Sequence, residues 1–124
     1  MRPARVLSAS SICSDRVWNN AGEELGNIEE LMIDIDSGRI AYAVLSFGGI
    51  LGFGDKLFAI PWNALKLDVA NNVFKLNIEK KVLEKAPGFD KDNWPDMADS
   101  AWGNEIYKHY GYQPYWDRDK SMKM

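Results

Sequence analysis

Two neighbouring stretches decide the fold: GEELGNIEELMID at residues 22–34 and SGRIAYAVLSFGG at residues 37–49. Late in the first stretch, apolar and polar residues alternate, which predicts a strand with two different faces. One face carries Leu31, Ile33 and Ile35, and the other carries Glu30, Met32, Asp34 and Asp36. The DSG run at 36–38 predicts a tight turn, because glycine accepts the positive φ that short loops need. The strand after it is apolar on both faces, so it needs cover on both sides.

Working outward, further short strands are predicted on either side of this hairpin. Strands at 16–18 and 24–26 flank a turn at 19–22, and a strand at 56–60 ends at a proline that cannot donate to a ladder. Two more strands, 65–68 and 73–78, flank a turn at 70–72. Five or six short strands at this spacing indicate a small barrel or sandwich.

The C-terminal third has a different pattern. Residues 79–85 predict two helical turns, 89–97 are irregular, and a second helix is expected from Asp99 or Ser100 to Tyr110, with Gly111 as its stop. Its apolar stripe is predicted to be Trp102, Ile106 and Tyr110, flanked by Tyr107. We therefore expect a flexible arm at 1–10, a barrel at 11–80, a helical aromatic extension at 81–116 and a disordered tail at 117–124. The extension would cover the two-sided strand, in its own chain or across a dimer.

Composition excludes several classes of protein. The chain has 124 residues, which predicts one domain, and its net charge of −3 argues against nucleic-acid binding. Its most apolar window, 40–60, is broken by glycines and charges, so we expect no membrane insertion. One cysteine and one histidine exclude a disulfide scaffold, a thiolate or imidazole metal site and most nucleophilic catalysis. Residues 1–14 lack the apolar run of a signal peptide, so we expect a cytoplasmic protein.

The ordered run of motifs resembles the PRC-barrel domain. The resemblance continues from the two opening stretches through GFGDK at 52–56 and AIPW at 59–62. The segment APGFDKDNWPDM at 86–97 is similar to the tail of a bacterial stand-alone subgroup. The resemblance implies a small, mostly antiparallel β-barrel that serves as a docking or assembly surface and not as an enzyme. The PRC-barrel fold is also that of the cytoplasmic domain of the reaction-centre H subunit and of one domain of a ribosome-maturation factor.

Two other segments suggest chemistry. The block 23–36 holds six carboxylates and no Lys or Arg, and is interpreted as a solvated face, an acidic docking edge or an oxygen-rich metal site. We expect no metal, because strand neighbours two apart lie in a line and do not converge. The loop 48–56 is rich in glycine, but it lacks the lysine and the helix of a phosphate loop. It instead offers Ile50, Leu51 and Phe53 for contact with the chain's own tail, a second subunit or a foreign partner.

Seven of the fifteen aromatic residues lie between Trp94 and Trp116. Residues 79–124 carry eight Lys or Arg against nine Asp or Glu, so base stacking in a basic groove is not expected. The predicted function is a non-catalytic interaction module with no cofactor, a homodimer that docks another cytoplasmic protein. Its predicted contacts are Ile50, Leu51, Phe53, Trp94, Trp102, Tyr107 and Tyr110. The alternative is a sensor that binds a small ligand or a metal in the cleft between barrel and tail.

Overall fold

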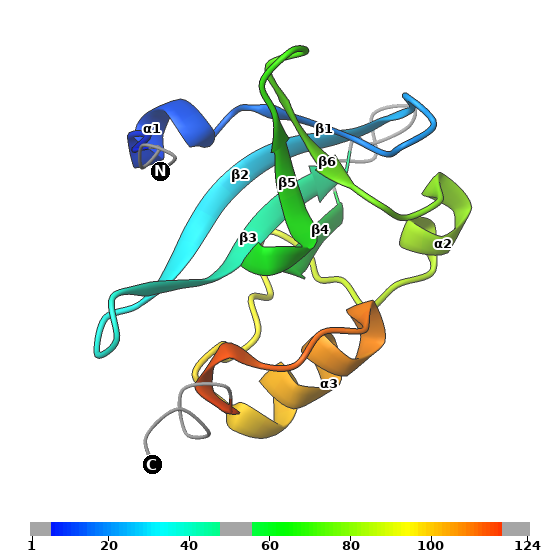
Figure 1. Ribbon diagram of the computed structural model, residues 1–124. Helices are drawn as coiled ribbons and strands as arrows, with labels where there is room; N and C mark the ends of the chain where they lie inside the picture. The colour runs from blue at the N-terminus through cyan, green and yellow to red at the C-terminus, as the bar shows by residue number, and fades with distance from the viewer. Residues whose placement is uncertain (1–5, 48–55, 118–124) are drawn as a thin grey trace.

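A computed structural model describes residues 6–47 and 56–117, and six strands in it form one curved sheet, a half-barrel (Figure 1). The strands lie in the order β4-β3-β2-β1-β6-β5. Their bounds are β1 Arg16–Trp18, β2 Glu24–Asp34, β3 Arg39–Phe47, β4 Lys56–Pro61, β5 Leu65–Asp68 and β6 Val73–Leu76. The predicted mainly β fold with a short helical C-terminal region is confirmed.

One pairing is parallel in the mostly antiparallel sheet that the sequence predicts. β1 and β6 run parallel, with Val17 beside Phe74, whereas the other four pairings are antiparallel. The chain passes through four other strands between β1 and β6, so no hairpin forces this pair to be antiparallel. The sheet is therefore mixed.

The β2–β3 hairpin turns at the predicted place. Gly38 has a φ of +76°, the left-handed conformation that glycine adopts without a Cβ penalty. The Asp34 carboxylate caps the turn from the other side, because its Oδ1 accepts hydrogen bonds from the backbone N–H groups of Asp36 (3.0 Å) and Ser37 (3.3 Å). This short polar side chain thus fixes both the turn and its own orientation.

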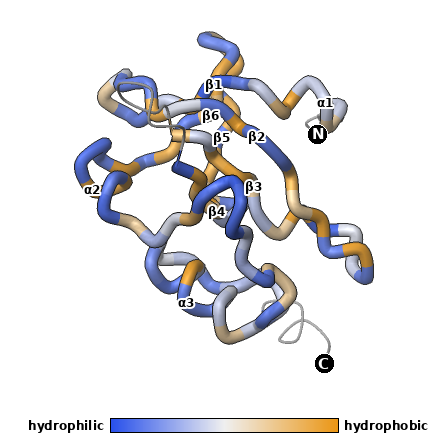
Figure 2. The backbone as a smooth tube through the Cα atoms, turned by 180° about the vertical axis from the view of Figure 1, so that it is seen from behind, coloured by the Kyte–Doolittle hydropathy of each residue, from blue (hydrophilic) through white to orange (hydrophobic). Residues whose placement is uncertain are grey.

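Leu31 and Met32 lie on the predicted opposite faces of β2, but the strand ends at Asp34, so Ile35 and Asp36, which were predicted on these faces, lie in the turn. Leu31 packs against the inner core and Met32 against the cluster on the outer face. Further along, Ile33 is 52% exposed and Ile35 is 89% exposed. The end of the hairpin extends beyond the strands that would cover it (Figures 1 and 2), which explains why these apolar side chains meet solvent.

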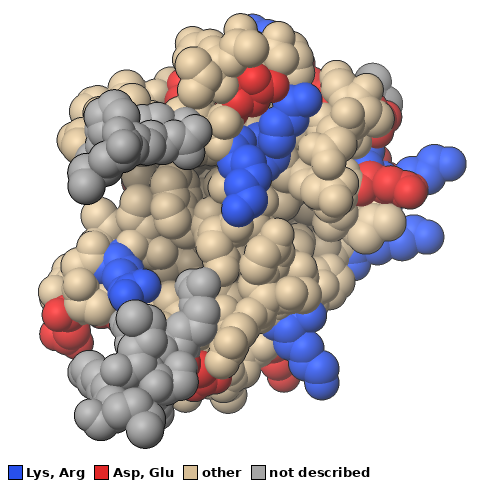
Figure 3. All heavy atoms as spheres, in the orientation of Figure 1, with Lys and Arg blue, Asp and Glu red and all other residues tan. Residues whose placement is uncertain are grey.

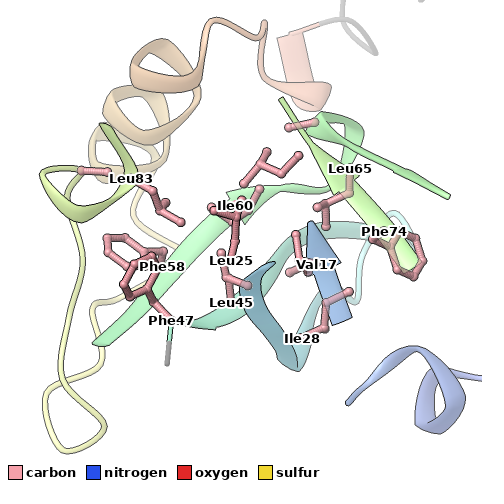
Figure 4. Packing of buried hydrophobic residues seen from close by; sticks show 14 of the residues in the cluster. Val17, Leu25, Ile28, Leu45, Phe47, Phe58, Ile60, Leu65, Phe74 and Leu83 are labelled. Atoms are coloured by element: carbon pink, nitrogen blue, oxygen red, sulfur yellow. The ribbon is translucent and has the colours of Figure 1, made fainter. Parts of the chain in front are cut away.

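The inner core lies in the concave side of the sheet and draws on every strand (Figure 4). Val17, Leu25 and Leu45 come from neighbouring strands and converge there with Phe58 and Ile60 of β4. Leu83 reaches the same core from α2 (Lys80–Glu84), a helix that starts one residue later than predicted. A helix at Ala9–Ile12, α1, begins within the expected N-terminal arm and adds Ile12.

A second layer covers the outer face of the sheet. Helix α3 (Ser100–Tyr110) begins after the N-cap Asp99, whose side chain accepts from the Ala101 N–H, and ends at Gly111 with a φ of +80°. Both ends match the sequence prediction. Ile106 and Tyr107 of this helix pack with Tyr42 of β3 and Ala59 of β4. The two-sided strand β3 is thus covered by the tail of its own chain.

Candidate functional site: the groove between hairpin and tail

The structure separates the seven predicted contact residues into three groups. Ile50, Leu51 and Phe53 lie outside the described residues. Trp94 is 40% exposed, and Trp102 and Tyr110 are half-buried. Tyr107 is only 1% exposed, so its side chain is buried within its own chain and offers no surface to a partner.

Tyr107 holds the helix to the sheet. Its hydroxyl donates a 2.7 Å hydrogen bond to the backbone carbonyl of Ala41, and its ring lies edge-on to Tyr42 with centroids 5.5 Å apart. Trp102 packs on Tyr42 in the same way, at 5.3 Å. The fully buried residues of α3 are Gly103, Ile106 and Tyr107, and Trp102 and Tyr110 of the predicted stripe pack half-buried against the same outer cluster.

Gly103 is the buried residue of α3 that the predicted stripe did not include. A Cβ at this position would lie 2.7 Å from the Tyr42 hydroxyl oxygen and 2.8 Å from Cη2 of Trp116. The missing side chain therefore lets both rings approach the helix, although glycine within a helix costs about 1 kcal/mol relative to alanine. Gly103 therefore faces the sheet, and Trp102 lies at the edge of the interface between the helix and the sheet.

A groove of about 610 Å³ lies where the end of the β2–β3 hairpin meets the tail. The hairpin and β3 contribute Met32, Ile33, Asp34, Ile35, Asp36, Ala41 and Tyr42 to its lining. The tail contributes Trp94, Pro95, Asp96, Met97, Ala98, Asp99, Ser100, Tyr115 and Trp116. Segments far apart in the sequence thus build one surface feature.

One short hydrogen bond ties the two walls together. The Tyr115 hydroxyl donates to Oδ2 of Asp34 at 2.5 Å, while Oδ1 of the same carboxylate caps the hairpin turn. The hydrogen bond from Tyr115, followed by those from the Ser37 and Asp36 N–H groups, lowers the pKa of Asp34 below its ordinary value of 3.8. Asp34 therefore stays ionised and contributes a fixed negative charge to the groove.

Tyr42 of β3 contributes to the groove lining, but its hydroxyl lies against Gly103 at the interface between α3 and the sheet. Its side chain is 1% exposed, and its hydroxyl is buried without a hydrogen-bond partner among the described residues. Burial, with a smaller contribution from Tyr107, raises the pKa of Tyr42, so this hydroxyl stays neutral. A buried hydroxyl without a partner costs free energy, which the packing of α3 on the sheet must offset.

The charges of the groove have one sign. Asp34, Asp36, Asp96 and Asp99 line it, and none of its lining residues is Lys or Arg. Over the wider face shown in Figure 3, by contrast, basic and acidic side chains are scattered across uncharged surface. The groove is thus an apolar trough with an acidic border. Within residues 6–47 and 56–117, no group of three or more His, Cys, Asp or Glu could hold a metal ion.

The comparison with protein families agrees with the sheet topology and the sequence motifs. The sequence model of the PRC-barrel domain matches residues 5–83. The chain belongs to the PRC-barrel domain family. The match ends at residue 83, so the hairpin wall of the groove lies within the PRC-barrel segment and the tail wall lies beyond it. A search of curated proteins found no significant match. Among the described residues, no helix is long and apolar enough to cross a membrane.

Sequence reasoning found parts of this site and missed the way they combine. It singled out Asp34 on the acidic face and Trp94 in the tail, but not Tyr115, Tyr42 or Asp96 as groove residues. The dense run of aromatics before residue 117 was the available signal for Tyr115. Nothing in the local pattern pairs it with a carboxylate 81 residues away.

Proposed function

We propose that this PRC-barrel protein is a non-catalytic docking module that binds another protein through the groove between hairpin and tail. The observation that carries the proposal is the exposure of Ile33, Ile35 and Trp94 at one acidic-bordered groove. Monomeric proteins seldom leave contiguous large apolar side chains in water unless the surface binds something. The expected cytoplasmic location belongs to the same proposal.

The absence of an enzymatic role is also part of the proposal. A catalytic acid needs a carboxyl pKa raised toward neutrality, whereas the pKa of Asp34, the carboxyl group that holds the two groove walls together, is lowered. Tyr42 and Tyr115 have raised pKa values, so neither is activated as a base. A lowered carboxyl pKa and raised tyrosine pKa values suit residues that form hydrogen bonds or carry a fixed charge, and not residues that transfer protons.

Site-directed photocrosslinking tests the docking role. A benzoylphenylalanine at position 33 should crosslink to a distinct protein in a lysate of the source cells. The same probe at Lys81, an exposed position on α2, serves as the matched control and should not. Equal products from both positions, or none from position 33, would contradict docking at the groove.

The predicted homodimer remains a proposal with its own test. The exposed Val69 and Val82, which lie outside the groove lining, support it, since exposed apolar side chains away from the groove can meet a second copy. Light scattering of the purified chain should give twice the 14.1 kDa monomer mass. A mass that stays monomeric at high concentration would exclude the dimer and leave the docking proposal standing.

A small-ligand sensor is the second candidate, and the volume of the groove favours it. About 610 Å³ lies within the roughly 300–1,000 Å³ range of small-molecule sites. A thermal-shift screen distinguishes this candidate, because a bound metabolite raises the melting temperature by mass action.

A further inference from the structure

The charge of the groove narrows the kind of partner that fits it. Four aspartates border it and no lining residue is basic, so a partner bearing Lys or Arg meets only attractive charge there. An acidic partner would bring like charges close to Asp34, which its hydrogen bond with Tyr115 keeps ionised. Such juxtaposition is costly and excludes wrong partners.

The apolar part of the groove sets a second requirement. Ile33 and Ile35 of the hairpin and Trp94 of the tail present their side chains to solvent on the two walls. A bulky apolar side chain placed between them would remove apolar surface of both partners from water, at about 25 cal/mol per Å². A purely basic, flexible segment would leave this surface uncovered.

We propose that the groove binds a short segment of another protein in which Lys or Arg residues flank a bulky apolar side chain. This inference rests on the proposed docking function and adds the chemistry of the partner. The volume of about 610 Å³ admits a few residues and not a whole domain face. The affinity should therefore be modest, on the order of micromolar, as for small interfaces.

A pair of synthetic peptides tests the partner chemistry on the full chain. The probe is a fluorescein-labelled hexapeptide of alternating lysine and leucine with one central tryptophan, and its control has glutamate at each lysine position. Fluorescence anisotropy at 50 mM salt should show saturable binding of the lysine peptide only. Raising the salt to 500 mM should weaken binding, because the shorter screening length reduces the attraction. Equal binding of both peptides would overturn the proposal.

Two matched charge reversals locate the binding. Asp36 is an exposed groove residue that makes no side-chain hydrogen bond in the hairpin turn, and Glu105 lies on the exposed side of α3 outside the groove lining. D36K and E105K change the net charge equally, but only D36K should weaken the lysine peptide, by about tenfold at low salt. Equal effects of the two variants would mean that net charge alone attracts the peptide, which would overturn the assignment to the groove.

A third variant separates failure of this inference from failure of the docking function. Ile33→Ser removes apolar contact area at a half-exposed position and should also weaken the lysine peptide about tenfold, with an unchanged circular dichroism spectrum. Crosslinking at position 33 without binding of the lysine peptide would overturn the partner chemistry and leave docking intact.

A doubled mass abolished by Ile33→Ser would assign the groove to a second copy. Peptide binding only after removal of residues 118–124 would assign it to the chain's own terminus. Either result overturns the proposal.

Discussion

At the scale of single residues, the Asp34 carboxylate connects three parts of the molecule. One oxygen accepts a hydrogen bond from the hydroxyl of Tyr115, and the other accepts hydrogen bonds from two N–H groups of the hairpin turn. Hydrogen bonds to a charged group are stronger than those between neutral groups, and each one lowers the pKa of an acid. The same carboxylate therefore orders the turn, anchors the tail and supplies charge to the groove.

Tyr115→Phe should lower the free energy of unfolding by about 1 kcal/mol at pH 7, less than the roughly 1.5–3 kcal/mol of a hydrogen bond to a charged group, because Asp34 is partly exposed. The folded-state pKa of Asp34 lies below its unfolded value of 3.8, so its contribution is present above pH 3.8 and is lost as pH falls through the folded value. The difference between wild type and variant should thus shrink below about pH 3.8.

Urea unfolding at pH 7 and at pH 3 measures this difference, and carboxyl NMR follows Asp34. In Tyr115→Phe the Asp34 pKa should rise but stay below 3.8, because the two turn N–H groups remain. Tyr112→Phe, which removes a nearby hydroxyl outside this contact, is the control. An unchanged Asp34 pKa in Tyr115→Phe would show that the hydrogen bond is not formed in solution.

At the scale of elements, the sequence predicted where strands and helices begin and end better than it predicted which of their side chains are buried. β3, β5 and α3 have the predicted limits, because a turn glycine, paired asparagines, an N-cap aspartate and a C-terminal glycine mark them locally. β6 ends at Leu76, two residues short of the prediction. The predicted stripe of α3 packs on the outer cluster but omitted Gly103, since periodicity assigns large aromatics to the core and cannot show that a glycine makes room for rings from other elements.

Gly103→Ala tests that explanation for the orientation of α3. Helix propensity alone predicts a gain of about 1 kcal/mol, but the new Cβ would meet the Tyr42 hydroxyl and Trp116 at less than 3 Å. Overpacking typically costs about 1–3 kcal/mol, so we expect net destabilisation of about 1 kcal/mol. Asn104→Ala, on the exposed side of the same helix, is the matched control and should be neutral or stabilising. Chemical denaturation that ranks Gly103→Ala at or above the control would contradict tight ring packing on α3.

At the scale of the whole molecule, two layers share the same strands. The inner core fills the concave side of the half-barrel, and α3 with Tyr115 and Trp116 covers the outer side of β3 and β4. The need for this cover was predictable from a strand that is apolar on both faces. The groove was not, because its walls meet only when residues near 34 and residues 94–116 come together in the folded chain.

This two-layer arrangement predicts that the PRC-barrel segment matched at 5–83 does not fold stably alone. A chain ending at Ala98 keeps every strand but loses α3 and Tyr115, which leaves Tyr42 and Ala59 facing water. Small domains have little stability in reserve, so we expect loss of cooperative thermal unfolding, binding of a hydrophobic dye and aggregation. A chain ending at Asp117 retains every described contact of the outer layer and should unfold like the full chain. If the chain ending at Ala98 stayed monomeric with an unchanged melting temperature, the tail would not stabilise the barrel, which would contradict its role as a second layer.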